Sequence, residues 1–205
     1  IIHFKVFNDG LGFRYHFPEQ PNLNEVKISN ELTEFSFPEE HNVWWIPVHS
    51  DNSYYESLYK KSPISKTDTI NTPATFETKD GMYLAIHEAN LTDFASMTLR
   101  YSGQNRFQSE LVPWADGVKV YAKTPFNTPW RTIIVAENPG ELVTSTLMLN
   151  LNEASEIEDV SWIEPSKYIG IWWGMHLDKY TWGSGEKHGA TTKNTKEYID
   201  FAAEN

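Results

Sequence analysis

The stretch Val6-Phe7-Asn8-Asp9-Gly10-Leu11-Gly12-Phe13-Arg14-Tyr15 carries the clearest fold signal in this sequence. Apolar side chains recur at every second position on both sides of Asn8-Asp9-Gly10, at Phe4 and Val6 before it and at Phe13, Tyr15 and Phe17 after it. This period is typical of a strand with one buried face, and the glycine supplies the positive φ that a tight turn needs. The stretch therefore predicts an antiparallel β-hairpin.

The same combination of short strands and turn residues continues to about residue 150. Further strands are predicted at Thr33–Phe37, Val43–Val48, Thr75–Thr78, Met82–His87, Ser96–Tyr101, Phe107–Val112, Gly117–Ala122, Thr132–Ala136 and Leu142–Leu149. Turns are predicted at Lys79-Asp80-Gly81, Ser102-Gly103, Ala115-Asp116-Gly117 and Asn138-Pro139-Gly140. Many short, evenly spaced strands favour a β-sandwich or barrel over βαβ units.

The pattern changes after Asn150. Residues 151–165 are acidic and irregular, which predicts a linker. The run Tyr168-Ile169-Gly170-Ile171-Trp172-Trp173 is apolar without alternation, as expected of a strand buried on both faces. We therefore predict a mainly β domain over 1–150 and, over 166–205, the first βα unit of a parallel α/β fold.

A helix is predicted to complete that βα unit. Asn194 stands three residues before Glu197, which is a helix-start signature, and Tyr198, Phe201 and Ala202 follow at helical spacing. Because one βα unit cannot form a barrel alone and the chain opens at Ile1 without Met, we expect a piece of a longer protein.

Composition and charge narrow the possible functions. The 205 residues carry a formal net charge of -11 and no cysteine. An acidic chain lacks the basic surface that nucleic acids and anionic membranes require, and the absence of cysteine excludes a disulfide scaffold, a thiolate zinc site and a cysteine nucleophile. No run approaches the ~20 apolar residues of a membrane span. The eight Trp, ten Tyr and eleven Phe fit a β-rich core and, secondarily, stacking on sugars.

Several blocks of the sequence resemble glycoside hydrolase family 97, in the order in which that family has them. They are Val6–Tyr15, Ile86-His87-Glu88-Ala89, Thr128-Pro129-Trp130-Arg131-Thr132-Ile133, Ser161–Trp173, Lys187-His188-Gly189-Ala190-Thr191-Thr192 and Tyr198-Ile199-Asp200-Phe201-Ala202-Ala203. The resemblance is closest to the starch-processing, SusB-like α-glucosidase branch.

The resemblance implies a galactose-mutarotase-like β-sandwich, partial here, followed by the start of a (β/α)₈ barrel. It implies exo-acting hydrolysis of α-glucosidic or α-galactosidic bonds of oligosaccharides, a Ca²⁺ ion held by several glutamates, and export to the periplasm or beyond. The catalytic acid and its base or nucleophile are expected beyond residue 205, so we name no catalytic residue. Oligomeric state, sugar preference, linkage, and inversion or retention stay open.

Glu88 is the residue that the resemblance matches to the sandwich's calcium ligand, and calcium prefers carboxylate oxygens. The alternative is a solvated glutamate at a strand end. Its neighbour His87 should face the opposite side of the strand, because successive strand residues alternate, and we assign it a structural or surface role.

Five other residues are candidates for sugar contacts. Trp173 and His176 end the expected barrel strand, on the side where such barrels bind substrates. Lys187 and His188 lie on the long loop that follows, and Trp114 lies at a strand edge in the sandwich. The alternatives are core packing for Trp173, a solvated loop for Lys187 and His188, and a domain contact for Trp114.

Two rival functions remain. One is a non-catalytic carbohydrate-binding sandwich, and the other is a mutarotase-like epimerase with a His/Glu acid–base pair. Neither rival needs the βα unit at the end of the chain. No nucleotide-binding glycine motif, zinc-protease helix or serine-nucleophile elbow competes with these hypotheses.

Overall fold

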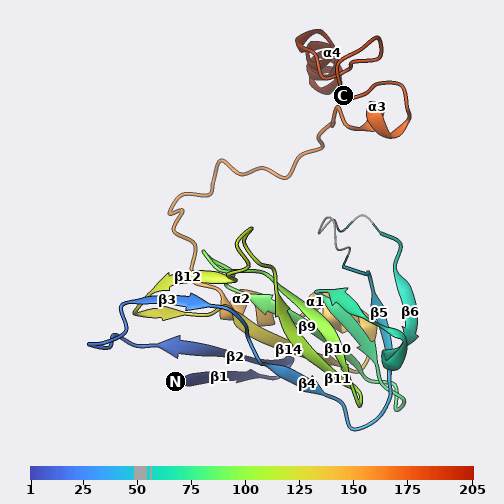
Figure 1. The fold of residues 1–205 in the computed structure, drawn as a ribbon. Coiled ribbons are helices and arrows are strands. Elements are labelled where there is room, and N and C mark those ends of the chain that lie inside the picture. Colours follow the sequence, from blue (N-terminus) through green and yellow to red (C-terminus); the bar gives the residue numbers. More distant parts are fainter. Residues whose placement is uncertain (49–54, 56) are drawn as a thin grey trace. The chain divides into compact units, whose positions relative to one another are not determined.

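The computed structural model describes residues 1–48, 55 and 57–205 (Figure 1). The chain divides into two compact units, Ile1–Ala154 and Ser155–Asn205. Each unit is considered by itself below.

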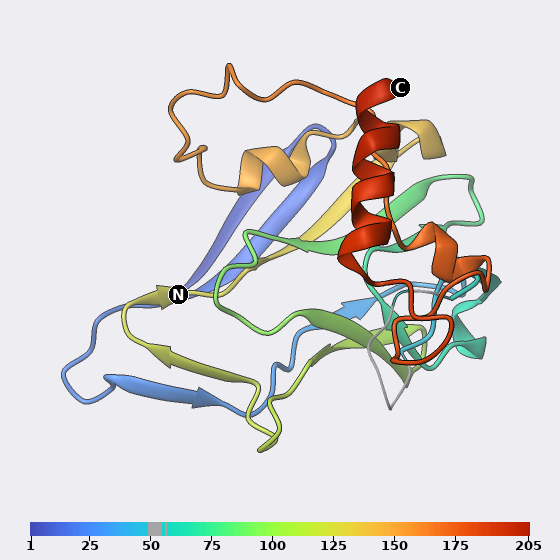
Figure 2. The same ribbon diagram turned by 90° about the horizontal axis from the view of Figure 1, so that it is seen from above.

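The first unit is built on a large antiparallel sheet (Figures 1 and 2). Its strands follow the order β1 (Ile2–Phe7), β2 (Gly10–Phe17), β14 (Trp130–Ala136), β9 (Tyr83–Ala89), β8 (Ala74–Glu77), β5 (Asn42–Trp45) and β6 (Lys60–Pro63), and β13 (Phe126–Asn127) pairs with β2. The predicted hairpin is confirmed, with register from Ile2 opposite Tyr15 to Phe7 opposite Gly10. A Cβ on Gly10 would lie 2.2 Å from the carbonyl oxygen of Ile133, so only glycine fits there.

A second sheet packs against this one. Its strands follow the order β4 (Glu34–Ser36), β11 (Arg106–Leu111), β10 (Met97–Gly103) and β7 (Thr69–Asn71), while β3 (Glu25–Ile28) and β12 (Val120–Lys123) form a separate ribbon and η1 (Ile64–Lys66) is a 3₁₀ turn. The main core contains side chains from both sheets: Phe35, Val43, Trp45, Ile64, Ile70, Ala74, Phe76, Ile86, Met97, Leu99, Phe107, Leu111 and Val120. The mainly β, sandwich architecture predicted from alternation is therefore present.

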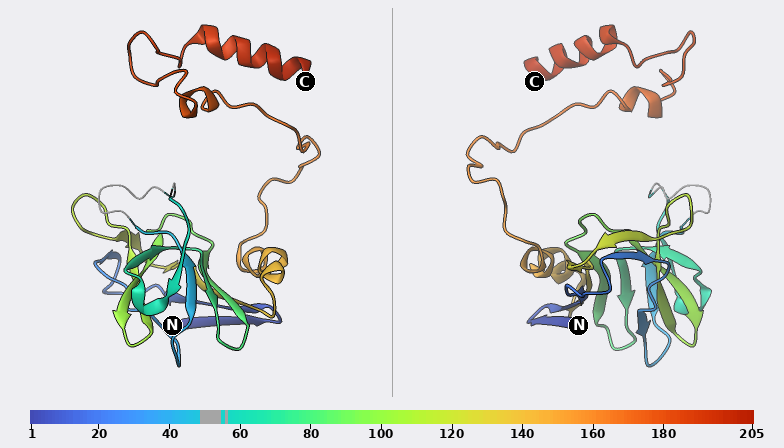
Figure 3. Two further views of the ribbon diagram at one scale, coloured as in Figure 1. Left: turned by 90° about the vertical axis from the view of Figure 1, so that its right-hand side faces the viewer. Right: turned by 60° about the vertical axis from the view of Figure 1, so that its left-hand side comes forward.

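A smaller core covers the other face of the large sheet. Helices α1 (Pro139–Thr144) and α2 (Leu147–Leu151) lie against β9 and β14 (Figure 3). This core consists of Ala85, Ala89, Trp130, Ile134, Leu147 and Leu151. Because strand residues alternate, Ala89 and Trp130 face the helices, whereas their neighbours Glu88 and Arg131 face the space between the two sheets.

The predicted strand Leu142–Leu149 is wrong, since these residues lie in α1, α2 and the turn between them. Asn138 caps α1, with its side-chain oxygen accepting from Gly140 N at 3.1 Å and Glu141 N at 3.3 Å. Pro139 takes the first helical position, where its missing N–H costs nothing. Asn138-Pro139-Gly140 is therefore a helix start, not a turn between strands.

The remaining predicted strands in the first unit each overlap an observed strand: β4, β5, β8, β9, β10, β11, β12 and β14. The sequence reading missed β3, β6, β7 and β13, which are two to four residues long. β3, β6 and β7 contain charged or polar residues at half or more of their positions, so they lack the apolar run that marks β5.

The second unit contains α3 (Trp173–His176) and α4 (Thr192–Glu204). The predicted helix is confirmed, but its cap is Thr191, whose hydroxyl accepts from Asn194 N at 3.2 Å. Asn194 itself lies inside the helix and donates to Gly189 O at 3.0 Å. None of the helices in the described residues is long and apolar enough to cross a membrane.

The buried strand predicted at Tyr168–Trp173 is not formed. Tyr168 is 93% exposed, residues 168–170 have no regular structure and α3 begins at Trp173. A strand needs a neighbour to bond its N–H and C=O groups, and no described strand lies beside this segment to supply one. The described residues therefore contain the helix of the predicted βα unit but not its strand.

Candidate functional site

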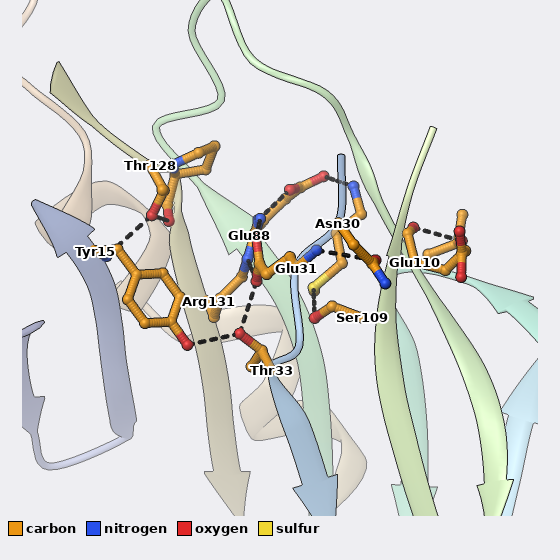
Figure 4. A network of polar contacts seen from close by, with 12 residues as sticks. Tyr15, Asn30, Glu31, Thr33, Glu88, Ser109, Glu110, Thr128 and Arg131 are labelled. Atoms are coloured by element: carbon orange, nitrogen blue, oxygen red, sulfur yellow. Dashed lines mark hydrogen bonds and ion pairs between the residues drawn. The ribbon is translucent and has the colours of Figure 1, made fainter. Parts of the chain in front are cut away.

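Three ionised side chains meet between the two sheets of the first unit (Figure 4). The Arg131 guanidinium is fully buried and donates to both carboxylate oxygens of Glu31, at 2.8 Å from Nε and 2.5 Å from Nη2. It also donates from Nη1 to Glu88 Oε2 at 2.7 Å. We call Glu31, Glu88 and Arg131 the buried triad.

The strand register places the triad. Glu88 on β9 and Arg131 on β14 are direct cross-strand partners, so their side chains leave the sheet on the same face. Glu31 comes from the chain just before β4 and is 8% exposed. The planar guanidinium serves both carboxylates at once because its donors form a fixed fork.

Neighbouring polar groups complete the bonding of the two carboxylates. Met97 N donates to Glu88 Oε1 at 2.9 Å, and the Thr33 hydroxyl donates to Glu31 Oε1 at 2.9 Å. The Tyr15 hydroxyl lies 2.8 Å from that of Thr33 and extends the network toward β2 (Figure 4). All four carboxylate oxygens of the triad therefore accept a hydrogen bond within the protein.

Burial and pairing act in opposite directions on the triad. Desolvation raises the pKa of Glu88 above its ordinary value, although Met97 N and Arg131 both favour the charged carboxylate. Burial alone would lower the pKa of Arg131, but the two carboxylates outweigh it and raise that pKa. The guanidinium therefore does not fully offset the desolvation of the Glu88 carboxylate.

This geometry does not fit a calcium ion at Glu88. Calcium takes six to eight oxygen ligands, whereas both Glu88 oxygens already accept hydrogen bonds and the adjacent guanidinium repels a cation. Within the described residues, no group of three or more His, Cys, Asp or Glu side chains could hold a metal ion. The assignment of Glu88 as a calcium ligand stays a prediction, which these contacts do not favour.

His87 faces away from the triad, as the alternation predicts. Its Nδ1 lies 3.1 Å from the Thr72 hydroxyl, and burial lowers its pKa. These contacts fit the structural role that the sequence predicts for His87.

Trp114 lies beside a pocket of about 470 Å³ on the surface of the first unit. Its side chain is 65% exposed. The pocket is lined by Asp93, Phe94, Ala95, Ser96, Val112, Pro113, Trp114, Lys119, Val120 and Tyr121. The residue predicted for a sugar contact is thus accessible and next to a cavity.

The candidates in the second unit form two groups. Trp173 and His176 both belong to α3, with ring centroids 6.5 Å apart, and His176 also stacks on Trp172 at 5.7 Å. Lys187 is exposed, while His188 Nδ1 lies 3.1 Å from Gly183 O within its own loop. Trp173 and His176 were predicted at the end of a barrel strand. In the structure they lie in the short helix α3.

Comparison with known families accounts for both units. Residues 1–154 match the family model described as Glycosyl-hydrolase 97 N-terminal, and residues 172–205 match the one described as Glycoside hydrolase 97. The chain belongs to glycoside hydrolase family 97. The resemblance found in the sequence blocks is therefore confirmed.

A solved family 97 enzyme from Pseudoalteromonas sp. strain K8, in complex with acarbose, is 50% identical in sequence and superposes with a TM-score of 0.87. The match covers 99% of this chain and 31% of that enzyme, a single-residue variant of which has been solved with panose.

Two curated relatives are more distant. "Retaining alpha-galactosidase" of Bacteroides thetaiotaomicron is 25% identical over 100% of this chain and 35% of its own length. "Probable retaining alpha-galactosidase" of Streptomyces bingchenggensis is 27% identical over 98% and 29%. The chain spans about a third of the length of these relatives.

Glu31 and Arg131 were not predicted as site residues of this family 97 chain, whereas Glu88 was singled out by the resemblance. Arg131 and Glu88 each stand two positions from an inward-facing isoleucine, Ile133 and Ile86, so strand alternation places both in the interior. Opposite charges at such positions are a signal for a buried ion pair. Glu31 precedes a strand of three residues and carries no comparable signal.

Proposed function

We propose that this chain is part of an exo-acting α-glycosidase that hydrolyses α-glucosidic bonds of oligosaccharides. The observation that carries the proposal is the 50% identity over 99% of the chain to an enzyme solved with acarbose and with panose, both of which contain α-linked glucose-type rings. Identity to the α-galactosidases is only 25% and 27%. The difference favours glucose over galactose as the sugar recognised.

The chemistry of the reaction is proposed to lie in the longer protein. Glycoside hydrolysis requires a carboxylic acid and a second carboxylate on either side of the scissile bond. Among the described residues, Glu31 and Glu88 are the buried carboxylates, and Arg131 binds both. We infer that the 205-residue chain alone does not turn over aryl α-glucosides.

We also propose that the full-length protein depends on Ca²⁺ and is exported to the periplasm or beyond. Both proposals rest on the family resemblance. The contacts of Glu88 give calcium no support, so no catalytic step is assigned to it.

The test is an assay of the full-length protein on p-nitrophenyl α-glucoside and α-galactoside, before and after EDTA. We expect preferential hydrolysis of the glucoside, loss of activity with EDTA and recovery with added Ca²⁺. Preferential hydrolysis of the galactoside would overturn the sugar assignment. Sugar binding without hydrolysis of either substrate would favour the binding-module alternative.

A further inference from the structure

The pocket beside Trp114 has two aromatic walls. Trp114 is held in a tight loop, since its N–H donates to Val118 O at 2.8 Å and its carbonyl accepts from Gly117 N at 2.9 Å. Across the pocket, Tyr121 on β12 donates its hydroxyl to Asp116. The Trp114 backbone and the Tyr121 hydroxyl are therefore both held by the same short turn, and the two side chains are 65% and 46% exposed.

One residue that lines the pocket also contacts the buried triad. Phe94 is half-buried, and the Arg131 guanidinium carbon lies 5.9 Å from the centre of its ring. Side chains that are already packed lose less freedom when a ligand binds, which reduces the ordering cost of binding.

Polar groups with free bonding capacity surround the aromatic rings. Lys119 Nζ donates to Glu110 Oε1 at 2.9 Å and to Leu111 O at 2.6 Å, which leaves one of its three N–H groups free. Among the described residues, neither the Asp93 carboxylate nor the Trp114 indole N–H makes a hydrogen bond. The pocket therefore offers both donors and an acceptor near an exposed indole face.

The charges around the pocket limit the ligand. Glu110 neutralises Lys119, and Asp93 adds a negative charge at the rim. An anionic ligand such as a phosphate would meet net repulsion. The volume of about 470 Å³ lies in the range of ligand sites, which are mostly apolar with a few placed polar groups.

We propose that this pocket is a binding site for a neutral pyranose ring of an α-linked glucose oligosaccharide. The C–H face of the sugar stacks on Trp114, its hydroxyls donate to Asp93, and the free N–H of Lys119 donates to a sugar oxygen. The choice of glucose units rests on the proposed function. The site itself rests on the pocket's own geometry.

The experiment titrates the 205-residue protein with maltotriose, followed by ¹H–¹⁵N NMR of the indole N–H signals. We expect saturable shifts with a Kd on the order of 1–10 mM, and Trp114→Ala to weaken binding about tenfold or more. The matched control is Trp162→Ala, which removes an exposed tryptophan of the second unit and leaves binding unchanged.

A second variant tests the hydrogen-bonding role. Asp93 has φ +48°, a conformation that glycine adopts without strain, so Asp93→Gly deletes the carboxylate and keeps the loop. We expect this variant to weaken maltotriose binding about threefold or more.

No saturable shift up to about 100 mM maltotriose would overturn the proposal, as would unchanged binding in Trp114→Ala. Equal shifts with glycerol, a polyol without a ring, would also overturn it. A negative result would not affect hydrolysis by the full-length enzyme. The pocket proposal and the proposed function are therefore tested independently.

Discussion

Arg131 determines whether two glutamates can be buried between the sheets. A buried ion pair gains little over an apolar pair of the same size, because desolvating the charges offsets their attraction. Removing one partner is different, since it leaves the other charge buried and unpaired. Arg131 is the partner of both Glu31 and Glu88, so its loss affects two charges at once.

Replacing Arg131 by methionine is expected to lower the free energy of unfolding by about 3–5 kcal/mol, because two buried carboxylates lose their counter-charge. Urea unfolding followed by tryptophan fluorescence measures the change. The control is Arg106→Met, which breaks the partly exposed pair with Glu34 and should cost no more than about 1 kcal/mol. A loss below about 1 kcal/mol for Arg131→Met would show that the triad is not a buried charge cluster.

Glu88→Gln tests the direction of the Glu88 pKa. Burial raises this pKa above its ordinary 4.5, so the carboxyl group contributes stability below its unfolded-state pKa and loses it as pH rises through the raised value. Glutamine does not titrate. In urea unfolding, the stability of the wild-type protein relative to Glu88→Gln should therefore fall over the pH range above the ordinary carboxyl pKa of 4.5. A relative gain by the wild type over that range would mean that pairing with Arg131 outweighs desolvation.

At the scale of single elements, the helix start at Asn138 orders the cover of the large sheet. Leu147 and Leu151 are fully buried against that sheet, and α1 leads directly into the helix that carries them. Without a cap, the first N–H groups of α1 lose their partner.

Asn138→Ala should lower the free energy of unfolding by about 1 kcal/mol, because Gly140 N and Glu141 N lose their acceptor. Asn138→Ser keeps an acceptor oxygen at the cap without placing a second carboxylate beside Glu141, and it should remain closer to wild type than Asn138→Ala. Thermal unfolding of the three proteins makes the comparison. Equal stability of all three would show that the cap contributes nothing.

The elements also show which structures the sequence could predict. Strands of seven or eight residues, such as β9 and β2, are long enough to be recognised. The prediction for Leu142–Leu149 is wrong because the leucines of this segment fit either a strand or a helix, and because Asn138-Pro139-Gly140 suits a turn as well as a helix start. The apolar run Tyr168–Trp173 is a poor guide for a different reason, since a strand buried on both faces depends on neighbours that its own sequence does not specify.

For the whole molecule, the order of the sequence blocks predicted the family, which spans both units. The site was less predictable. Glu88 was singled out by the resemblance, but only the structure shows that Arg131 binds it and that Glu31 shares the same guanidinium. Likewise, Trp114 is a candidate from the sequence alone. Asp93 is distant from it in the sequence and Tyr121 lies on β12, and only the structure shows that all three line one pocket.

We propose that the longer protein releases glucose from the non-reducing ends of α-linked oligosaccharides. Product analysis by chromatography tests this, after the full-length protein acts on panose and, separately, on the α-galactoside raffinose. We expect stepwise release of glucose from panose and little galactose from raffinose. Galactose released from raffinose with panose left intact would contradict it.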